Sequence, residues 1–260
     1  MDEKIKNTIK LSKQIRKDVL YLSYLKKTAH LGSSLSCADI ISYVYQTVVK
    51  KNSQNKFILS KGHAATSLYS ALFRKKFISK KIFMSYCNPG SLLEEHPSPK
   101  INGVECATGS LGHGLPFGCG IALANKIKGN DYKTLVLISD GECNEGTTWE
   151  SALFAASQRL SNLVLFIDYN KWQATGRSEE IMMIKPLHEK FKSFGWDAIV
   201  IDGNNIKEID KAFLKRNKRP KVIVANTIKG KGVSVMEDNN NWHYRSPSKL
   251  EIDLFLKEIK

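Results

Sequence analysis

The sequence has no long apolar run and no paired cysteines. Its 260 residues include no stretch near the ~18 apolar residues that a membrane-crossing helix needs, and no apolar segment follows the polar start at residues 1–4. We therefore predict neither a membrane span nor a secretory signal, and expect a cytoplasmic protein. The five cysteines form no C-x-x-C pair and are odd in number, which disfavours a disulfide framework or a zinc site.

Acidic residues are also scarce, with 25 Asp and Glu against 40 Lys and Arg, so the formal net charge is +15. Such an excess can mark a protein that binds nucleic acid. Here the lysines are scattered, arginine is used sparingly and no aromatic-basic repeat occurs. We therefore favour an anionic small ligand or an acidic partner subunit over nucleic acid.

Short apolar segments alternate with helical patterns, and neither an internal repeat nor a low-complexity linker interrupts them. This alternation predicts an α/β fold, a three-layer doubly wound parallel sheet, with residues 1–260 forming a single domain. The predicted strands cover residues 57–59, 134–138, 163–167, 198–201 and 222–225. The predicted helices cover residues 3–28, 37–49, 64–73, 111–128, 145–159, 185–194 and 206–216, with a short one near the C-terminus. Two long loops, 87–110 and 227–248, are candidates for function.

Polar residues follow two of the predicted strands directly. Asp140 and Gly141 come after one strand, and Asn170 comes after the next. A single strand-helix-strand crossover can place these two strand ends side by side, where open parallel sheets bind ligands. A carboxylate and an amide oxygen suit Mg²⁺, which completes its octahedron with phosphate oxygens, and the helix that follows Gly141 favours an anion. The spacing indicates a magnesium-diphosphate site, although Asp140 and Asn170 could serve only as turn residues.

Further motifs are distributed along nearly the whole chain. They are Ala29-His30-Leu31-Gly32 with Ala38-Asp39-Ile40, Leu59-Ser60-Lys61-Gly62-His63, His96-Pro97, Gly103-Val104-Glu105, Thr108-Gly109-Ser110-Leu111-Gly112-His113-Gly114, Asp140-Gly141-Glu142-Cys143-Asn144-Glu145-Gly146, Thr227-Ile228-Lys229-Gly230-Lys231-Gly232 and Trp242-His243. In their joint order and spacing, they resemble the N-terminal, diphosphate-binding domain of transketolases. The resemblance implies the thiamine-diphosphate-binding fold in its PP-type form, and thiamine diphosphate with Mg²⁺ or Ca²⁺ as cofactors.

The resemblance also implies a role for each matching residue. Asp140, Asn170 and the main-chain carbonyl of Trp172 match the metal ligands of the family. Gly141 matches the glycine whose backbone N–H donates to the diphosphate, and His63 matches a histidine beside it.

Other matches concern the pyrimidine end of the cofactor and the substrate. Gly109 and Leu111 match a stretch whose backbone contacts the aminopyrimidine, and Glu145 matches an acidic residue buried near the subunit interface. The implied catalytic residues, which face the donor sugar and the reacting carbons, are His30, His96 and His243, with His243 also near the diphosphate. Imidazole suits such work because it exchanges protons near neutral pH.

Transketolases also require a glutamate from a pyrimidine-binding domain that lies downstream. This sequence ends at Lys260, soon after Trp242-His243, and contains no second such domain. The resemblance therefore implies a split enzyme, in which a separate C-terminal subunit carries the pyrimidine-binding domain and the catalytic glutamate, with two copies of each chain in a heterotetramer. It would transfer a two-carbon ketol unit from a ketose (phosphate) donor to an aldose acceptor.

Several alternatives remain open at this point. Leu31, Glu95, Ser139 and Tyr244 depart from the common transketolase pattern, and all but Ser139 fall near the expected substrate funnel. A specialised ketol-transferring enzyme of sugar or secondary-metabolite biosynthesis is therefore one alternative. Others are a 2-oxo-acid dehydrogenase α-subunit, deoxyxylulose-phosphate synthase and a non-catalytic, partner-binding remnant.

Overall fold

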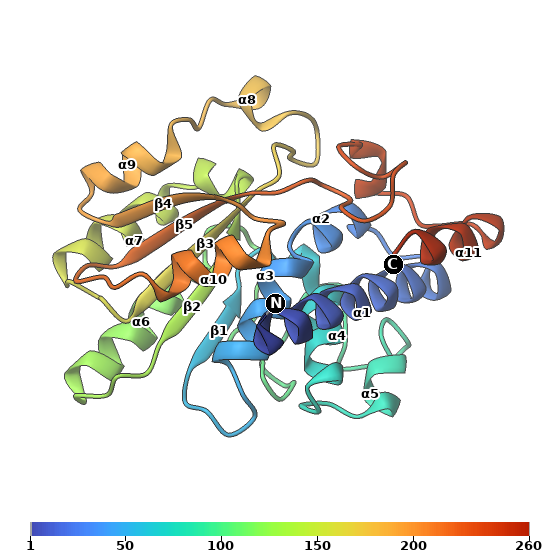
Figure 1. The fold of residues 1–260 in the computed structure, drawn as a ribbon, viewed down its shortest axis with the longest axis horizontal. Helices are drawn as coiled ribbons and strands as arrows, with labels where there is room; N and C mark the ends of the chain where they lie inside the picture. The colour runs from blue at the N-terminus through green and yellow to red at the C-terminus, as the bar shows by residue number, and fades with distance from the viewer. Residues whose placement is uncertain (1, 260) are drawn as a thin grey trace.

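The computed structural model describes residues 2–259 and contains a five-stranded, all-parallel sheet (Figure 1). The strand order is β1-β2-β3-β5-β4. The strands are β1 (Lys56–Leu59), β2 (Thr134–Ser139), β3 (Leu163–Tyr169), β4 (Asp197–Asp202) and β5 (Lys221–Asn226). Each predicted strand is present within two residues of its expected bounds, so the predicted α/β class is confirmed.

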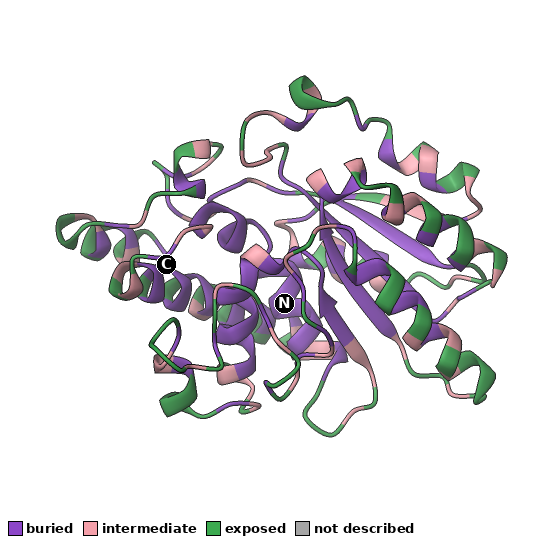
Figure 2. Cartoon of the chain, turned by 180° about the vertical axis from the view of Figure 1, so that it is seen from behind, coloured by how far each residue is buried: buried purple, intermediate pink, exposed green. Residues whose placement is uncertain are grey.

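Helices cover both faces of the sheet. Successive strand residues point to opposite sides, so each strand contributes apolar side chains to two cores. Leu135 and Leu137 of β2 belong to one apolar core, whereas Val136 and Ile138 belong to the other. The first core is covered by α1 (Glu3–Lys26), α2 (Leu31–Ser36), α3 (Ala38–Tyr43), α4 (Ala65–Arg74), α10 (Ile206–Leu214) and α11 (Lys249–Glu258). The second is covered by α6 (Gly114–Ile127), α7 (Gly146–Ser157) and α9 (Leu187–Ser193). Figure 2 shows the strands buried between these layers.

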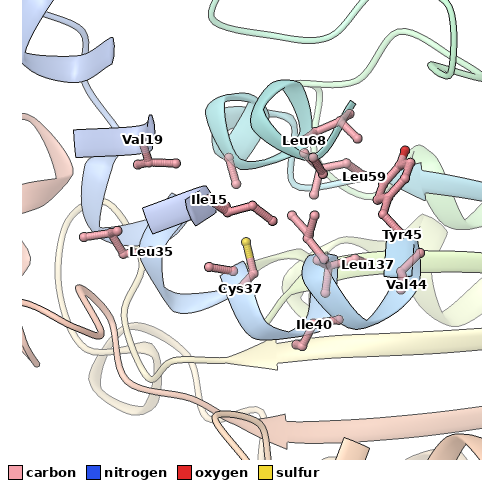
Figure 3. Packing of buried hydrophobic residues seen from close by; sticks show 14 of the residues in the cluster. Ile15, Val19, Leu35, Cys37, Ile40, Val44, Tyr45, Leu59, Leu68 and Leu137 are labelled. Atoms are coloured by element: carbon pink, nitrogen blue, oxygen red, sulfur yellow. The ribbon is translucent and has the colours of Figure 1, made fainter. Parts of the chain in front are cut away.

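The first core holds the N-terminal helices against the sheet. Ile15 and Val19 of α1 pack beside Cys37, and Leu59 and Leu137 approach them from the strands (Figure 3). This packing fixes the residues that follow α1 relative to the strand ends. Within residues 2–259, no helix combines the length and the apolar character that crossing a bilayer demands.

The helix predicted over residues 37–49 is present as α3, which continues into a single π-helical turn at Val44–Val48. A separate short helix, α2, precedes it from Leu31 and was not expected from the sequence. The small residues of α2 allow it to pack closely, since a Cβ on Gly32 would lie 3.1 Å from Cγ of Lys229. Two short helices, α5 (Lys80–Met84) and α8 (Ser178–Ile181), were not expected from the sequence.

The α6 helix lies close to β2 because Gly118 faces the sheet. A Cβ at Gly118 would lie 2.4 Å from Cγ2 of Val136. We expect Gly118→Ala to lower the free energy of unfolding by about 1–3 kcal/mol, since α6 would have to move away from the sheet.

The matched control is Gly120→Ala in the same helix. A Cβ at Gly120 would meet no other atom of the described residues within 4 Å. Because alanine has the higher helix propensity, this change should raise the free energy of unfolding by up to about 1 kcal/mol. Chemical denaturation of both variants tests the packing, and equal midpoints would contradict it.

Candidate active site

A cleft opens at the carboxyl edge of the sheet, with a volume of about 270 Å³. Nine of the predicted site residues line it: His30, His63, His96, Gly109, Leu111, Gly141, Asn170, Trp172 and His243. Ser33, Ser139 and residues 173–175 line it as well. Asp140 is buried beside Gly141, and Glu145 lies outside the cleft on the surface. A larger cavity of about 650 Å³ lies near α1 and α10, but none of the predicted residues lines it.

The parallel register places the ends of β2 and β3 side by side. Ser139 pairs with Asp168, and the N–H of Asp140 donates to the carbonyl of Asp168 at 3.3 Å. Asn170 follows the last residue of β3 directly. The expected proximity of the two strand ends therefore follows from ordinary parallel strand pairing.

Asp140 is a buried carboxylate at this edge. Its Oδ1 accepts from the N–H of Gly141 at 3.0 Å, and its Oδ2 accepts from Lys171 N–H at 2.9 Å and Ser178 Oγ at 2.8 Å. Burial raises the pKa of Asp140 to about 7. A cation bound here would replace the solvation that burial removes, which fits a metal ligand. In this structure the Gly141 N–H is engaged with Asp140.

The Asn170 amide is oriented by its neighbours. Its Nδ2 donates to Asp168 Oδ2 and to Ser36 Oγ, both at 3.4 Å, while its Oδ1 accepts from the N–H of Trp172 at 3.0 Å. The amide oxygen therefore lies on the side of the Trp172 turn. Asp168 is itself held in a fully buried ion pair with Lys61.

The residue types restrict how a cation can bind. Within residues 2–259, no group of three or more His, Cys, Asp and Glu side chains is arranged to hold a metal ion. A cation here would depend on the Asp140 carboxylate, the Asn170 amide, a backbone carbonyl and oxygens of its own ligand. This oxygen-only set fits Mg²⁺ or Ca²⁺ and does not resemble a zinc site.

The turn that contains Trp172 is held from the outer side by two contacts. Nε1 of Trp172 donates to Asp238 Oδ1 at 2.8 Å, and the Arg177 guanidinium lies 3.8 Å from the centroid of the indole ring. Arg177 also forms an ion pair with Asp238 at 2.6 Å. These contacts connect the turn after β3 to the loop after β5.

Four histidines from separate segments meet across the cleft. The ring centroid of His30 lies 4.9 Å from that of His243, 5.5 Å from that of His63 and 6.1 Å from that of His96. His30 has a left-handed backbone with φ of 66°, and its N–H donates to the carbonyl of His243 at 2.6 Å. The end of α1 is thereby joined to the end of the 227–248 loop.

Burial keeps three of these imidazoles neutral. It lowers the pKa of His30, lowers the pKa of His63 further, and lowers the pKa of His243 to about 3. The nearby ammonium groups of Lys61 and Lys229 act in the same direction. At neutral pH these rings can accept a proton on one nitrogen and donate from the other.

Lys229 lies directly behind the cleft wall at His243, and the sequence analysis assigned it no role. Its side chain is fully buried, and its Nζ donates to Asn240 Oδ1 at 2.5 Å and lies 3.2 Å from Nδ1 of His243. Burial lowers its pKa to about 8. Its ammonium faces the ring of Trp172, with 6.0 Å to the centroid, and suits an anion. The only sign of Lys229 in the sequence was its position within the Thr227–Gly232 motif, and that motif does not show that the side chain is buried.

Glu142, two residues after Asp140, is the buried acid of this turn. Its carboxylate accepts from the N–H of Ser139 at 2.8 Å and of Gly112 at 3.0 Å, and from the hydroxyl of Ser60. Burial raises its pKa. It therefore holds the Gly109–Leu111 wall of the cleft against β2. Glu145, by contrast, is exposed in this chain, so its expected burial requires another chain.

The neutral histidines predict how stability depends on pH. Unfolded His243 would take up a proton near pH 6.5, whereas the folded imidazole stays neutral down to about pH 3. The contribution of His243 to folding stability should therefore decrease as the pH falls from about 6.5 towards 3. We expect His243→Gln to make this decrease shallower, in thermal unfolding followed at several pH values.

The control is His113→Gln, which changes an exposed histidine. This variant should retain the pH dependence of the wild type. A His243→Gln profile that coincides with the wild-type profile would contradict the neutral, buried state of that ring.

These features define a class of protein: an α/β protein with a cleft at the carboxyl edge of its sheet that is lined by imidazoles and suits an anionic ligand. The model of the family "Transketolase, thiamine diphosphate binding domain" matches residues 10–257. The chain belongs to the transketolase family and corresponds to its N-terminal, thiamine-diphosphate-binding part.

Similar proteins include both split and full-length enzymes. The chain is 35% identical over 258 residues to one of the subunits of apulose-4-phosphate transketolase from Phocaeicola vulgatus, covering 95% of this chain and 92% of that relative. It is 36% identical over 219 residues to a 6-deoxy-6-sulfo-D-fructose transketolase subunit of a Clostridium species, covering 80% of each. The crystal structure of Campylobacter jejuni transketolase superimposes with a TM-score of 0.88 at 25% identity, covering 99% of this chain. This chain spans only 43% of that protein.

Proposed function

We propose that this chain is the cofactor-binding subunit of a two-chain transketolase. Together with a separate C-terminal subunit, it transfers a two-carbon ketol unit from a ketose donor to an aldose acceptor. The observation that carries the proposal is the meeting of four histidines from four segments over the Asp140–Asn170 edge. Residues 1–260 act as one thiamine-diphosphate-binding domain in this proposal.

The cation and the diphosphate are assigned to the buried edge. Asp140, Asn170 and the Trp172 carbonyl would hold Mg²⁺ or Ca²⁺. The backbone of Gly141, the imidazole of His63 and the Lys229 ammonium would contact the diphosphate. An all-oxygen donor set around a desolvated carboxylate supports this assignment, since hard cations prefer oxygen.

We assign the pyrimidine end of the cofactor and the sugar substrate to the other walls of the cleft. The backbone of Gly109 and Leu111 would contact the aminopyrimidine. Thiamine diphosphate, when bound, supplies the carbanion chemistry of ketol transfer. His30, His96 and His243 would bind the hydroxyl and carbonyl oxygens of the sugar and move protons at those oxygens, because neutral imidazoles can both donate and accept.

A partner subunit completes this proposal. The C-terminal subunit would carry the pyrimidine-binding domain and the catalytic glutamate, and two copies of each chain would form a heterotetramer. One observation supports a second chain: the Phocaeicola vulgatus relative, 92% of which is covered, is named as one subunit of its enzyme. The same partner would bury Glu145 at the start of α7.

A specialised substrate is a second candidate within this activity. Relatives of this chain are named for apulose-4-phosphate and for 6-deoxy-6-sulfo-D-fructose. Glu95 precedes His96, and its Oε1 lies 3.4 Å from the N–H of Ala29, which precedes His30. This carboxylate therefore lies near two of the three histidines assigned to the substrate, His30 and His96, and would favour donors whose hydroxyls, rather than an anionic group, reach this position.

The metal assignment predicts a loss of cofactor binding in Asp140→Ala. The wild-type chain, alone or with its partner, should bind thiamine diphosphate in the presence of Mg²⁺, and Asp140→Ala should weaken binding by more than about 100-fold. Quenching of tryptophan fluorescence and calorimetry both measure this. Asp131→Ala, at an exposed position, is the control and should bind normally. Equal affinity in the two variants would remove Asp140 from the site.

Ketol transfer should require both chains. The assay combines this chain, the C-terminal transketolase subunit of the same organism, thiamine diphosphate and Mg²⁺ with hydroxypyruvate as donor and ribose 5-phosphate as acceptor. We expect a ketose product only when both chains are present. Product from this chain alone would contradict the need for a partner. If the pair binds cofactor without forming product, the specialised substrate becomes the favoured interpretation, and apulose-4-phosphate is tested as donor.

A further inference from the structure

Gln173 lies in the turn after β3, and the nitrogen of its side chain is buried without a partner. This Nε2 atom is shielded from solvent and forms no hydrogen bond with any of residues 2–259. A buried amide donor without a partner is unfavourable in a native protein, because it has lost its hydrogen bonds to water. Such a group indicates an acceptor that the chain itself does not supply.

The carboxamide of Gln173 lies at the wall of the cleft, against Gly141. Gln173 lines the cleft, and a Cβ built on Gly141 would lie 3.3 Å from Cγ, 3.4 Å from Cδ and 3.5 Å from Oε1 of Gln173. The side chain therefore folds over the glycine that follows Asp140. The lack of a side chain at Gly141 leaves the room that the carboxamide occupies.

The backbone of this turn is fixed by its neighbours. The N–H of Gln173 donates to the carbonyl of Gly176 at 2.9 Å, and the carbonyl of Ala174 accepts from Asn240 Nδ2 at 3.1 Å. Oδ1 of Asn240 accepts in turn from Lys229 Nζ at 2.5 Å. The backbone of Gln173 is therefore held in place, while its amide nitrogen remains available to a ligand.

The neighbouring backbone donors at this edge are already engaged within the chain. The N–H groups of Gly141 and Lys171 both donate to Asp140. The N–H of Trp172 donates to the amide oxygen of Asn170. An anion that enters the cleft beside Gly141 would therefore meet the carboxamide as a donor that does not have to give up an existing hydrogen bond.

The charges around the carboxamide favour an anionic acceptor. The buried ammonium of Lys229 lies 6.0 Å from the ring centroid of Trp172, the residue that precedes Gln173. A phosphate oxygen accepts hydrogen bonds and donates none, so it matches an amide nitrogen, which only donates. Hydrogen bonds to charged oxygens are also stronger than those between neutral groups. The structure thus offers a phosphate group an amide donor and an ammonium from two separate segments.

We propose that Gln173 belongs to the diphosphate site, where its Nε2 donates a hydrogen bond to a phosphate oxygen beside Gly141. This inference rests on the proposed function, which assigns the diphosphate to this edge. It adds a side-chain donor to the groups assigned there. The carboxamide is then required for tight binding of the diphosphate and not for the choice of sugar.

The test measures binding of magnesium pyrophosphate and of thiamine diphosphate, by calorimetry, to this chain in complex with its C-terminal subunit. Gln173→Met keeps the length of the side chain and removes the donor, so both affinities should fall about tenfold. Gln173→Glu keeps the shape and adds a negative charge, so both should fall further than in Gln173→Met. The matched control is Gln158→Met at the end of α7, outside the cleft, which should bind both ligands like the wild type.

Thermal unfolding without ligand separates binding from a structural role. Gln173→Met should unfold at the wild-type temperature or above it, because the change removes a buried donor that has no partner. A lower unfolding temperature together with weaker binding would assign Gln173 to the fold and overturn the proposal.

The remaining outcomes distinguish this inference from the proposed function. Equal affinities of Gln173→Met and the wild type would overturn the inference and leave the proposed function standing. Binding by Gln173→Glu that is as tight as by Gln173→Met would exclude an anionic acceptor. A raised KM for hydroxypyruvate with unchanged cofactor affinity would assign the carboxamide to the sugar and also overturn the inference. A wild-type complex that binds neither ligand would contradict the proposed function and this inference together.

Discussion

A buried ion pair between Lys61 and Asp168 connects the elements that build the cleft. Both side chains are fully buried, and Asp168 also receives hydrogen bonds from Ser36 of α2 and Thr227 after β5. One carboxylate thereby joins the ends of β1, β3 and β5 to the first short helix. Removing one partner of a buried pair leaves an uncompensated charge and costs about 3–5 kcal/mol, so the arrangement of the strand ends depends on the pair as a unit.

The Lys61–Asp168 ion pair also orients the Asn170 amide. Because Asp168 accepts from the Asn170 amide nitrogen, the amide oxygen lies on the side of the Trp172 turn. Asp140, one strand away, is desolvated strongly enough that its pKa is raised to about 7. The buried ammonium of Lys229 and the neutral imidazoles complete a surface suited to a cation, an anion and a polyol together.

Local pattern predicted the fold and part of the site well, for a physical reason. Strands such as residues 134–139 are apolar on both faces because both faces are covered, and this is visible in the sequence. The short helix α2 was missed, and it packs closely against Lys229, almost two hundred positions away, where a Cβ on Gly32 would lie 3.1 Å from Cγ of the lysine. The roles of the individual site residues remain predictions, and the structure shows only that nine of them line one cleft.

The sequence by itself determined the parallel sheet, the order of its elements and the neighbourhood of Asp140 and Asn170, because right-handed crossovers place consecutive strand ends at the same edge. Only the tertiary structure decided that His30, His63, His96 and His243 meet, that Lys229 is buried, and that Glu142 rather than Glu145 is the buried acid. It also decided which apolar residues of α6 and α7 remain outside the core. These features depend on contacts between distant segments, and burial and pKa follow from such packing and not from local sequence.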